Sequence, residues 1–310
     1  MSKRFLYFTI VLSAILMWSF SFPLIKIVLD NGVPPITLAA IRAIIFIPIL
    51  IFLLIKNGRK NIPISKEDWL IYLSIGLFTI ILPGILQNTG MMYTTASVSS
   101  IIQTSGPIFT IIFAIVLLNE SADIKKIIGS ICALIGTIFL VISLDNNINL
   151  LDSSVFGNFL ILLSGISYAI SSIITKKGLE RKNPLQILGF SSLVGFIVLS
   201  LISTFEKPLH IIINLSLETW FAIILLAIFP SFIAILFWYE AMINEEISRL
   251  VIFVYLMPVF AVIFSYILIG EVISFQTILF AILIIVGVAL AQKNSGKLSK
   301  KSKCNIVLKK

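Results

Sequence analysis

The chain has 310 residues, of which 59% are hydrophobic and 12% are charged, and its formal net charge is +9 at pH 7. Its mean hydropathy of +1.11 is far above that of soluble domains. The positive charge lies mostly in short loops and in the C-terminal tail, so the composition excludes a soluble two-domain protein and argues against a nucleic-acid partner. Cys132 and Cys304 offer neither a disulfide framework nor a metal-binding pattern, and we expect no metal and no cofactor.

Ten apolar stretches are long enough to cross a bilayer as helices. In chain order they are residues 5–29, 36–55, 69–89, 95–118, 125–143, 156–176, 184–204, 219–239, 247–269 and 273–292. The first is too long for a signal peptide and has no cleavage site, so we expect it to be retained. The lysine-rich tail, residues 293–310, shows no apolar period and is expected to be disordered and attracted to anionic lipid.

The second half of the chain repeats the first. Residues 69–136 align without a gap on residues 220–287. The matched pairs include Trp69 with Trp220, Pro107 with Pro258 and Glu120 with Glu271. We therefore expect one repeat at residues 5–143 and another at 156–292, with five spans in each. Because five is odd, the second copy enters from the opposite side, and the predicted fold is an all-α membrane protein of ten transmembrane helices in two inverted-topology repeats.

The distribution of Lys and Arg predicts the orientation. If the N-terminus is cytoplasmic, the outer loops contain Lys207 and no other Lys or Arg, and the remaining Lys and Arg residues of the loops and the tail lie inside. Such an asymmetry predicts a multi-pass protein of the cell membrane with both termini in the cytoplasm.

Two basic residues lie within the predicted spans. Lys26 is near the outer end of the first span, and Arg42 is in the outer third of the second. A cation at membrane depth is costly, so both are candidates for binding an anionic group of a substrate. The alternative is that each side chain extends to the outer headgroups. Arg42 lies deeper, which favours a binding role there.

Aromatic and hydroxyl side chains form a second set of candidates. Trp18 and Ser21 lie about one helical turn apart near the middle of the first span, and Tyr168 and Ser171 are their counterparts in the second repeat. We expect them to line a cavity on the pseudo-two-fold axis. The alternative is that the hydroxyls bond to their own backbone and the rings pack against neighbouring helices.

Polar residues toward the outer halves of spans three and four complete the predicted binding site. They are Gln87, Asn88 and Gln103. In the second repeat Trp238 and Tyr239 occupy the positions of Gln87 and Asn88, at the inner end of the eighth span. An interfacial aromatic belt is the alternative for these two rings.

The aligned prolines and glutamates are candidates for hinges and gates. Pro107 and Pro258 each remove a backbone hydrogen bond, so spans four and nine should kink there. Tyr255, one turn before Pro258, is a cavity candidate by position. Glu120 and Glu271 end the same two spans on opposite faces, as gates or as solvated helix-end carboxylates. No carboxylate lies deep in any span, so the sequence contains no clear proton relay.

These residues resemble a known family. The two copies of five spans contain the segment Trp-Ser-Phe-Ser-Phe-Pro at residues 18–23, Lys26, Arg42, Pro107, Glu120, Pro258 and Gly270-Glu271. This combination is similar to the EamA branch of the drug/metabolite transporter superfamily. The resemblance covers about residues 5–292. It implies a carrier of small organic solutes in the cytoplasmic membrane, often an exporter of amino acids or related metabolites.

We therefore expect a secondary transporter, an exporter of small polar metabolites such as amino acids, which works by alternating access. The partners would be a small-molecule substrate and the lipid bilayer, and a homodimer is left open. A channel-like facilitator or a drug exporter is the alternative. A membrane-embedded enzyme would need clustered His, Asp or Glu, which the sequence does not place together, so we do not expect an enzyme.

Overall fold

The computed structural model describes residues 3–57, 63–120 and 153–270, with single positions and short pieces between 124 and 135 and between 275 and 287. Every regular element in this part of the chain is helical. The first half contains α1 (Lys3–Asp30), α2 (Pro35–Lys56), α3 (Lys66–Ile75), η2 (Gly76–Ile81), α4 (Leu82–Met91), α5 (Ala96–Gln103) and α6 (Gly106–Leu118). The second contains α8 (Ser153–Leu179), α9 (Pro184–Ser203), η3 (Thr204–Glu206), α10 (Pro208–Ile213), α11 (Leu217–Ile228), η4 (Phe229–Ile233), α12 (Ala234–Asn244), α13 (Ile247–Leu250), η5 (Val251–Leu256) and α14 (Met257–Ile269).

Eight helical segments in the described residues are long and apolar enough to cross a bilayer. They correspond to eight of the ten predicted spans, although the third runs from Lys66 to Met91 and the eighth from Leu217 to Asn244, beyond their predicted bounds. The predicted fifth and tenth spans, 125–143 and 273–292, lie largely outside the described residues, as do Glu271 and the tail. The positions that are described between 124 and 135 and between 275 and 287 are helical.

Equivalent N-caps explain why the third and eighth spans begin early. The carboxylate of Asp68 accepts hydrogen bonds from the backbone N and the Oγ of Ser65, at 2.6 and 2.9 Å. Ser216 lies 151 residues after Ser65, the spacing of the aligned repeats, and its Oγ accepts a hydrogen bond from the backbone N of Thr219 at 3.2 Å. Such caps satisfy amide groups that have no partner in the first turn.

Two pairs of equivalent spans are interrupted. The third and eighth spans contain the π-helical turns η2 and η4, which are not expected from the sequence. Pro83 is the second residue of α4, which follows η2. Pro230 lies inside η4, where a missing amide hydrogen prevents a regular helical ladder. The helix is interrupted in both spans where a kink is expected: α6 begins at Gly106, next to Pro107, and α14 begins at Met257, next to Pro258.

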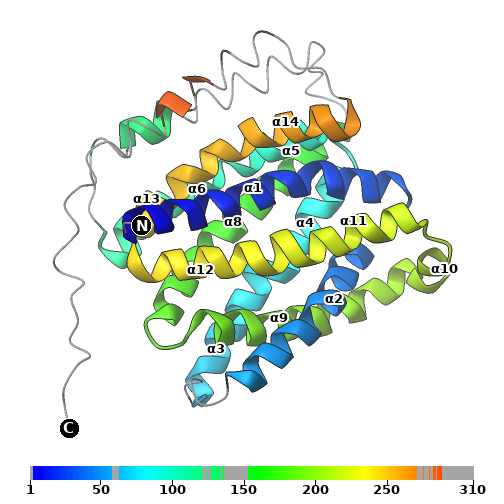
Figure 1. Ribbon diagram of the computed structural model, residues 1–310, viewed down its shortest axis with the longest axis horizontal. Coiled ribbons are helices and arrows are strands. Elements are labelled where there is room, and N and C mark those ends of the chain that lie inside the picture. Colours follow the sequence, from blue (N-terminus) through cyan, green and yellow to red (C-terminus); the bar gives the residue numbers. More distant parts are fainter. Residues whose placement is uncertain are drawn as a thin grey trace.

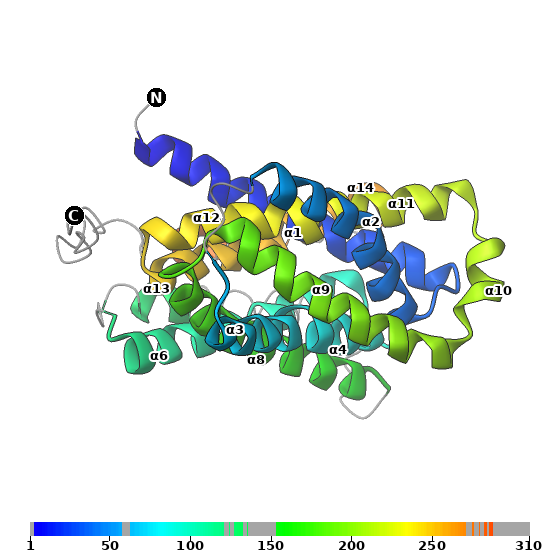
Figure 2. The same ribbon diagram turned by 90° about the horizontal axis from the view of Figure 1, so that it is seen from below.

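The two repeats are interleaved. α1 packs against α11, α12 and α14 of the second half, and α8 packs against α3, α4 and α6 of the first. Figure 1 shows α1 running between α14 and the α11–α12 pair, and Figure 2 shows α8 beside α3, α4 and α6. The first helix of each repeat therefore buries much of its surface against the other repeat, and α2 packs against its counterpart α9.

The pseudo-two-fold relation extends to individual contacts. Lys26 Nζ donates to the carbonyl of Met91 at the end of α4, at 3.3 Å, and pairs with Asp30 at 3.1 Å. Lys176, its counterpart, donates to the carbonyl of Met242 near the end of α12. A cation at a helix C-terminus is stabilised by the unpaired carbonyls there. These lysines are thus bonded to helix ends.

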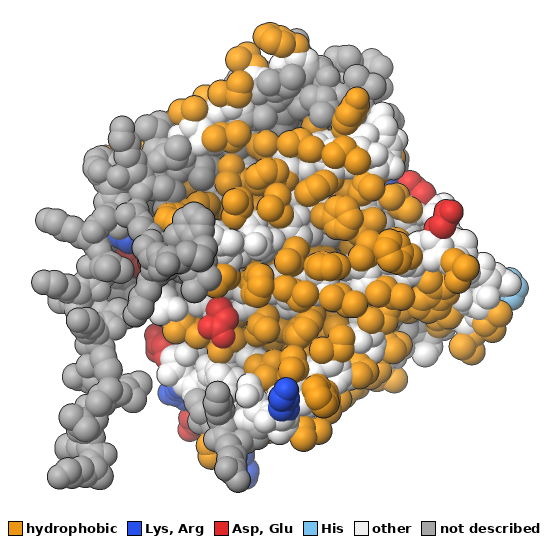
Figure 3. Space-filling model, viewed as in Figure 1, with side chains coloured by type: hydrophobic (Ala, Val, Ile, Leu, Met, Phe, Trp, Pro, Cys, Tyr) orange, Lys and Arg blue, Asp and Glu red, His pale blue; other side chains and the backbone are white. Residues whose placement is uncertain are grey.

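The outer surface of the helices is apolar. Figure 3 shows hydrophobic side chains over the middle of one face, while charged side chains and the histidine lie toward its ends. Large hydrophobic side chains exposed on the protein include Phe52, Leu70, Val116, Leu201 and Ile267. An apolar surface bounded by charge is what a bilayer requires.

Small residues allow α4 and α8 to lie close together. A Cβ atom on Gly157 would be 2.6 Å from the carbonyl oxygen of Gly90, and one on Gly90 would be 2.7 Å from the carbonyl oxygen of Gly157. The helices therefore meet backbone to backbone at this point, as small residues permit in membrane proteins.

Candidate functional site

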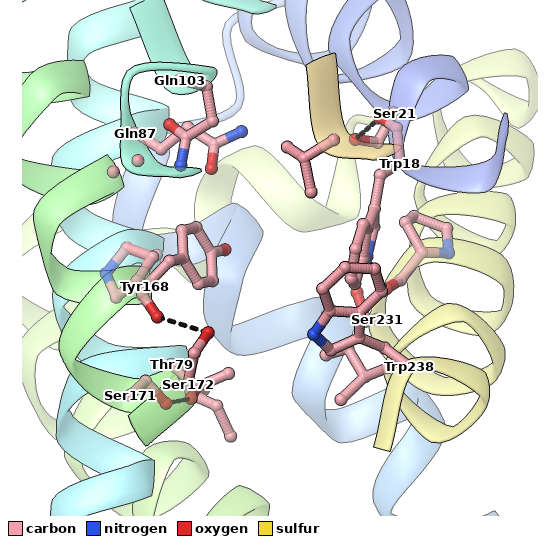
Figure 4. A pocket seen from close by; sticks show the side chains of 18 of the residues that line it. Trp18, Ser21, Thr79, Gln87, Gln103, Tyr168, Ser171, Ser172, Ser231 and Trp238 are labelled. Atoms are coloured by element: carbon pink, nitrogen blue, oxygen red, sulfur yellow. Dashed lines mark hydrogen bonds between the residues drawn. The ribbon is translucent and has the colours of Figure 1, made fainter. Parts of the chain in front are cut away.

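A cavity of about 210 Å³ lies between helices of both repeats (Figure 4). From the first half it is lined by residues of α1, α2, η2, α4, α5 and α6, and from the second by residues of α8, α9, η4, α12, η5 and α14. Its wall is mostly apolar with a few polar groups, a composition typical of sites for small molecules.

Most of the residues proposed from the sequence line this cavity. They are Trp18, Ser21, Arg42, Gln87, Asn88, Gln103, Tyr168, Ser171, Trp238 and Tyr239, together with Pro107. Trp238 and Tyr239 are 6% and 4% exposed, so both rings lie inside the protein and not in an interfacial belt.

Arg42 carries the charge of the site. Its Nε and Nη2 atoms donate to Ser231 Oγ at 3.0 and 2.7 Å, and Ser231 Oγ in turn donates to the carbonyl of Leu226 at 2.8 Å. No carboxylate of a described residue forms an ion pair with the guanidinium. Placing a cation at membrane depth costs about 2.5–3.5 kcal/mol. An unpaired guanidinium in such a place is suited to an anionic ligand.

Two indole rings form one wall. The rings of Trp18 and Trp238 are 5.2 Å apart with an interplanar angle of 59°. Trp18 Nε1 donates to the carbonyl of Pro230 at 3.1 Å, which fixes the position of its ring. Figure 4 shows the two indoles together, facing Tyr168 and Thr79 across the open space. This wall offers flat apolar surface to a bound solute.

Hydroxyl groups occupy the opposite wall. The hydroxyls of Thr79 and Ser171 are hydrogen-bonded to each other, and Ser167 Oγ donates to the carbonyl of Phe78 at 2.9 Å. Thr79 and Phe78 belong to η2, whereas Ser167 and Ser171 belong to α8. The helix α8 thus bonds to the π-helical turn of the first repeat, as α1 bonds through Trp18 to that of the second. Each π-helical turn thus anchors the first helix of the other repeat at the cavity wall.

Amide side chains lie at a third side. Figure 4 places Gln87 of α4 beside Gln103 of α5, across from Ser21. Gln103 Oε1 is buried and has no hydrogen-bond partner among the described residues. Asn88 Nδ2 donates to the carbonyl of Pro35 at 3.0 Å and so joins α4 to the start of α2. Gln103 therefore retains an acceptor oxygen for a ligand.

The remaining candidates lie elsewhere. Lys26 is bonded to Met91 and Asp30, and Tyr255 is fully buried in η5 outside the cavity. Pro258 is at the start of α14, and its side chain does not line the cavity. Glu120 accepts hydrogen bonds from the backbone N atoms of Ile247 and Ser248, at 2.8 and 2.9 Å, and so joins the end of α6 to the start of α13. Glu271 lies outside the described residues.

Several lining residues were not predicted. They include Thr79, Thr110, Thr175, Ser192 and Ser231. Ser192 aligns with Arg42 at the looser spacing of the first helices, so the charge of the site breaks the two-fold symmetry. Pro230 beside Ser231 is a signal that the sequence carried, because proline in a predicted span marks a break where polar groups become accessible.

These features define a multi-pass membrane protein built from two inverted repeats around a partly polar cavity. The family model described as the EamA-like transporter family matches the chain twice, at residues 5–142 and 155–292. The chain belongs to this family, which is part of the drug/metabolite transporter superfamily, and is a membrane transporter.

Similar proteins agree with this assignment. A protein of Archaeoglobus fulgidus named as an uncharacterized transporter is 28% identical over 279 residues, which cover 89% of this chain and 93% of the relative. The uncharacterized transporter YyaM of Bacillus subtilis is 26% identical over 243 residues, which cover 78% of this chain and 79% of the relative. A WAT1-related chloroplastic protein of Arabidopsis thaliana is also 26% identical, over 94% of this chain and 70% of its own.

A solved crystal structure has the same fold. It superposes with a TM-score of 0.74 and is 19% identical in sequence. The match covers 92% of this chain and 96% of the chain in the solved structure. At this identity the likeness bears on the fold alone.

Proposed function

We propose that the protein is a secondary transporter that exports small polar metabolites, amino acids among them, across the cytoplasmic membrane by alternating access. The observation that carries this proposal is the cavity between the interleaved repeats. Its otherwise apolar wall contains several polar groups and a guanidinium that forms no ion pair with a described residue. In transporters built from inverted repeats, the substrate site lies near the bilayer midplane between the repeats. The outward direction rests on the family resemblance.

The proposed orientation places both termini in the cytoplasm. It rests on the bias of Lys and Arg toward the loops on that side. In this orientation Glu120 and the start of α13 are at the cytoplasmic end of the cavity, and Glu206 and the start of α2 are at the outer end.

Contacts between the repeats at both ends would serve as gates. At the inner end, Glu120 of the first repeat bonds to α13 of the second. At the outer end, the Glu206 carboxylate accepts hydrogen bonds from the backbone N of Thr37 at 2.6 Å, from Thr37 Oγ1 at 2.7 Å and from the backbone N of Ile36 at 3.2 Å. In alternating access the contacts at one end form while those at the other end break.

A counterflow experiment tests the proposal. Purified protein in liposomes that are preloaded with one of a panel of amino acids, organic anions and organic cations should accelerate entry of the same labelled solute. The entry rate should saturate with external concentration. A rate that rises linearly and is unaffected by internal solute would indicate a channel and would contradict alternating access. Direction is checked by release of a transported solute from intact cells that contain or lack the protein.

A further inference from the structure

The cavity contains one charged side chain among the described residues, and it is positive. The lining includes Arg42 but no Asp, Glu or Lys. The sequence shows that the two incompletely described spans do not change this balance, because residues 124–143 and 272–292 contain no Asp or Glu. A substrate that carries an ammonium group would therefore find no carboxylate in the site.

The guanidinium retains hydrogen-bonding capacity. Ser231 Oγ receives bonds from Nε and Nη2, while Nη1 has no hydrogen-bond partner among the described residues. The proton of the Ser231 hydroxyl is used by the carbonyl of Leu226, so the serine holds the arginine without neutralising it. A guanidinium presents a planar set of donors that matches the two oxygens of a carboxylate.

The cation and the aromatic wall are held by neighbouring residues. Trp18 Nε1 bonds to the carbonyl of Pro230, and Arg42 bonds to the hydroxyl of Ser231, which is the next residue in η4. The π-helical turn therefore fixes the indole ring and the guanidinium relative to each other. A ligand with an anionic group attached to a flat apolar body would meet both at once.

We propose that the cavity selects organic monoanions with a flat apolar body, aromatic carboxylates above all, over zwitterions and cations with the same skeleton. The carboxylate would bind Arg42, and the flat body would lie against the Trp18–Trp238 wall. This inference rests on the proposed function for the identity of the site, and it narrows the substrate class from polar metabolites in general to anions.

A matched series of three ligands tests the charge selection. The series is 3-phenylpropionate, L-phenylalanine and 2-phenylethylamine, which at neutral pH are an anion, a zwitterion and a cation. Thermal unfolding of the purified protein is measured over a range of concentrations of each ligand, because a ligand that binds the folded state raises the melting temperature of the protein. The anion should bind about tenfold or more tightly than the zwitterion, and the cation should produce no shift. Equal binding of the three, stronger binding of the amine, or no shift with the anion would overturn the inference.

Arginine variants locate the selection. Arg42→Gln should remove the preference for the anion, and Arg42→Lys should reduce it, because the charge remains while the paired donors are lost. Arg181→Gln is the matched control, since Arg181 is 62% exposed in a surface pair with Glu67. Gel filtration shows whether each variant is folded. If Arg42→Gln does not fold, the preference of the Arg42→Lys variant decides the test. An unchanged preference in folded Arg42→Lys and Arg42→Gln would contradict the assignment to Arg42.

Counterflow separates this inference from the proposed function. The exchange rate of each of the three ligands is measured in liposomes that contain the protein. The rate in protein-free liposomes is subtracted, because the uncharged acid leaks through the bilayer. Exchange that favours the zwitterion or the amine would support transport and overturn the anion selection. Binding in the expected charge order without exchange of any solute would support the selection and overturn the proposed transport.

Discussion

Removal of the Glu120 carboxylate is expected to open the inner end of the cavity. The carboxylate joins the end of α6 to the backbone N atoms of Ile247 and Ser248 at the start of α13. These segments belong to different repeats and must separate if the cavity opens on that side. Glu120→Ala removes both hydrogen bonds, and Glu120→Gln keeps one acceptor oxygen without the charge.

The expected size of the effect follows from the geometry. Each of the two bonds is charge-assisted and would be worth about 1.5–3 kcal/mol in a dry site. Glu120 is only half-buried, so solvent weakens both bonds, and the helix N-terminus adds about 0.3–1 kcal/mol at such a place. A net loss of about 1–2 kcal/mol in one state changes the ratio of the two states by about fivefold to thirtyfold.

Accessibility of a single cysteine measures this ratio. With Cys132 and Cys304 replaced by serine, Thr175→Cys places a thiol in the cavity wall on α8. A membrane-impermeant maleimide added to inside-out vesicles should label this thiol about fivefold to thirtyfold faster in Glu120→Ala, with Glu120→Gln between the two. Glu218→Ala removes an exposed carboxylate from α11 and should leave the rate unchanged. A folded Glu120→Ala variant labelled at the wild-type rate would refute the gating role.

Two further predictions concern stability in detergent. Gly157→Ala should lower the melting temperature, because its Cβ would be 2.6 Å from the Gly90 carbonyl oxygen and must force α4 and α8 apart at a cost of about 1–3 kcal/mol. Gly165→Ala on the same helix, where the atom nearest to the new Cβ is 3.4 Å away, should be neutral or stabilising. Equal effects of the two substitutions would contradict the close-packing argument. Lys182→Met should destabilise by about 3 kcal/mol, because it leaves the buried carboxylate of Asp68 without its cation at 2.7 Å. Arg181→Met, which breaks an exposed pair, should cost less than about 1 kcal/mol, and similar melting temperatures would show that burial of the pair does not matter.

The sequence alone was sufficient for the repeats and for most of the spans. Hydropathy, the aligned prolines and the bias of basic residues are linear signals, and each span responds to its own composition. The breaks at Pro107 and Pro258 were predictable for the same reason, since proline removes a backbone donor wherever it lies in a helix. The π-helical turns η2 and η4 were not predicted, because Pro83 and Pro230 mark a break in a span without showing which kind of turn replaces the helix.

The sequence favoured Arg42 over Lys26 by depth alone, and the tertiary structure decided between them. Lys26 bonds to the end of α4, whereas Arg42 lies in the cavity wall. The partner of Arg42 is Ser231, which is 189 residues away in the chain. Which face of a helix meets a cavity depends on its rotation against neighbours, and here the neighbours of α1 and α8 come from the opposite repeat. Periodicity in an almost uniformly apolar helix carries little of that information, so the packing between repeats decided which polar residues meet.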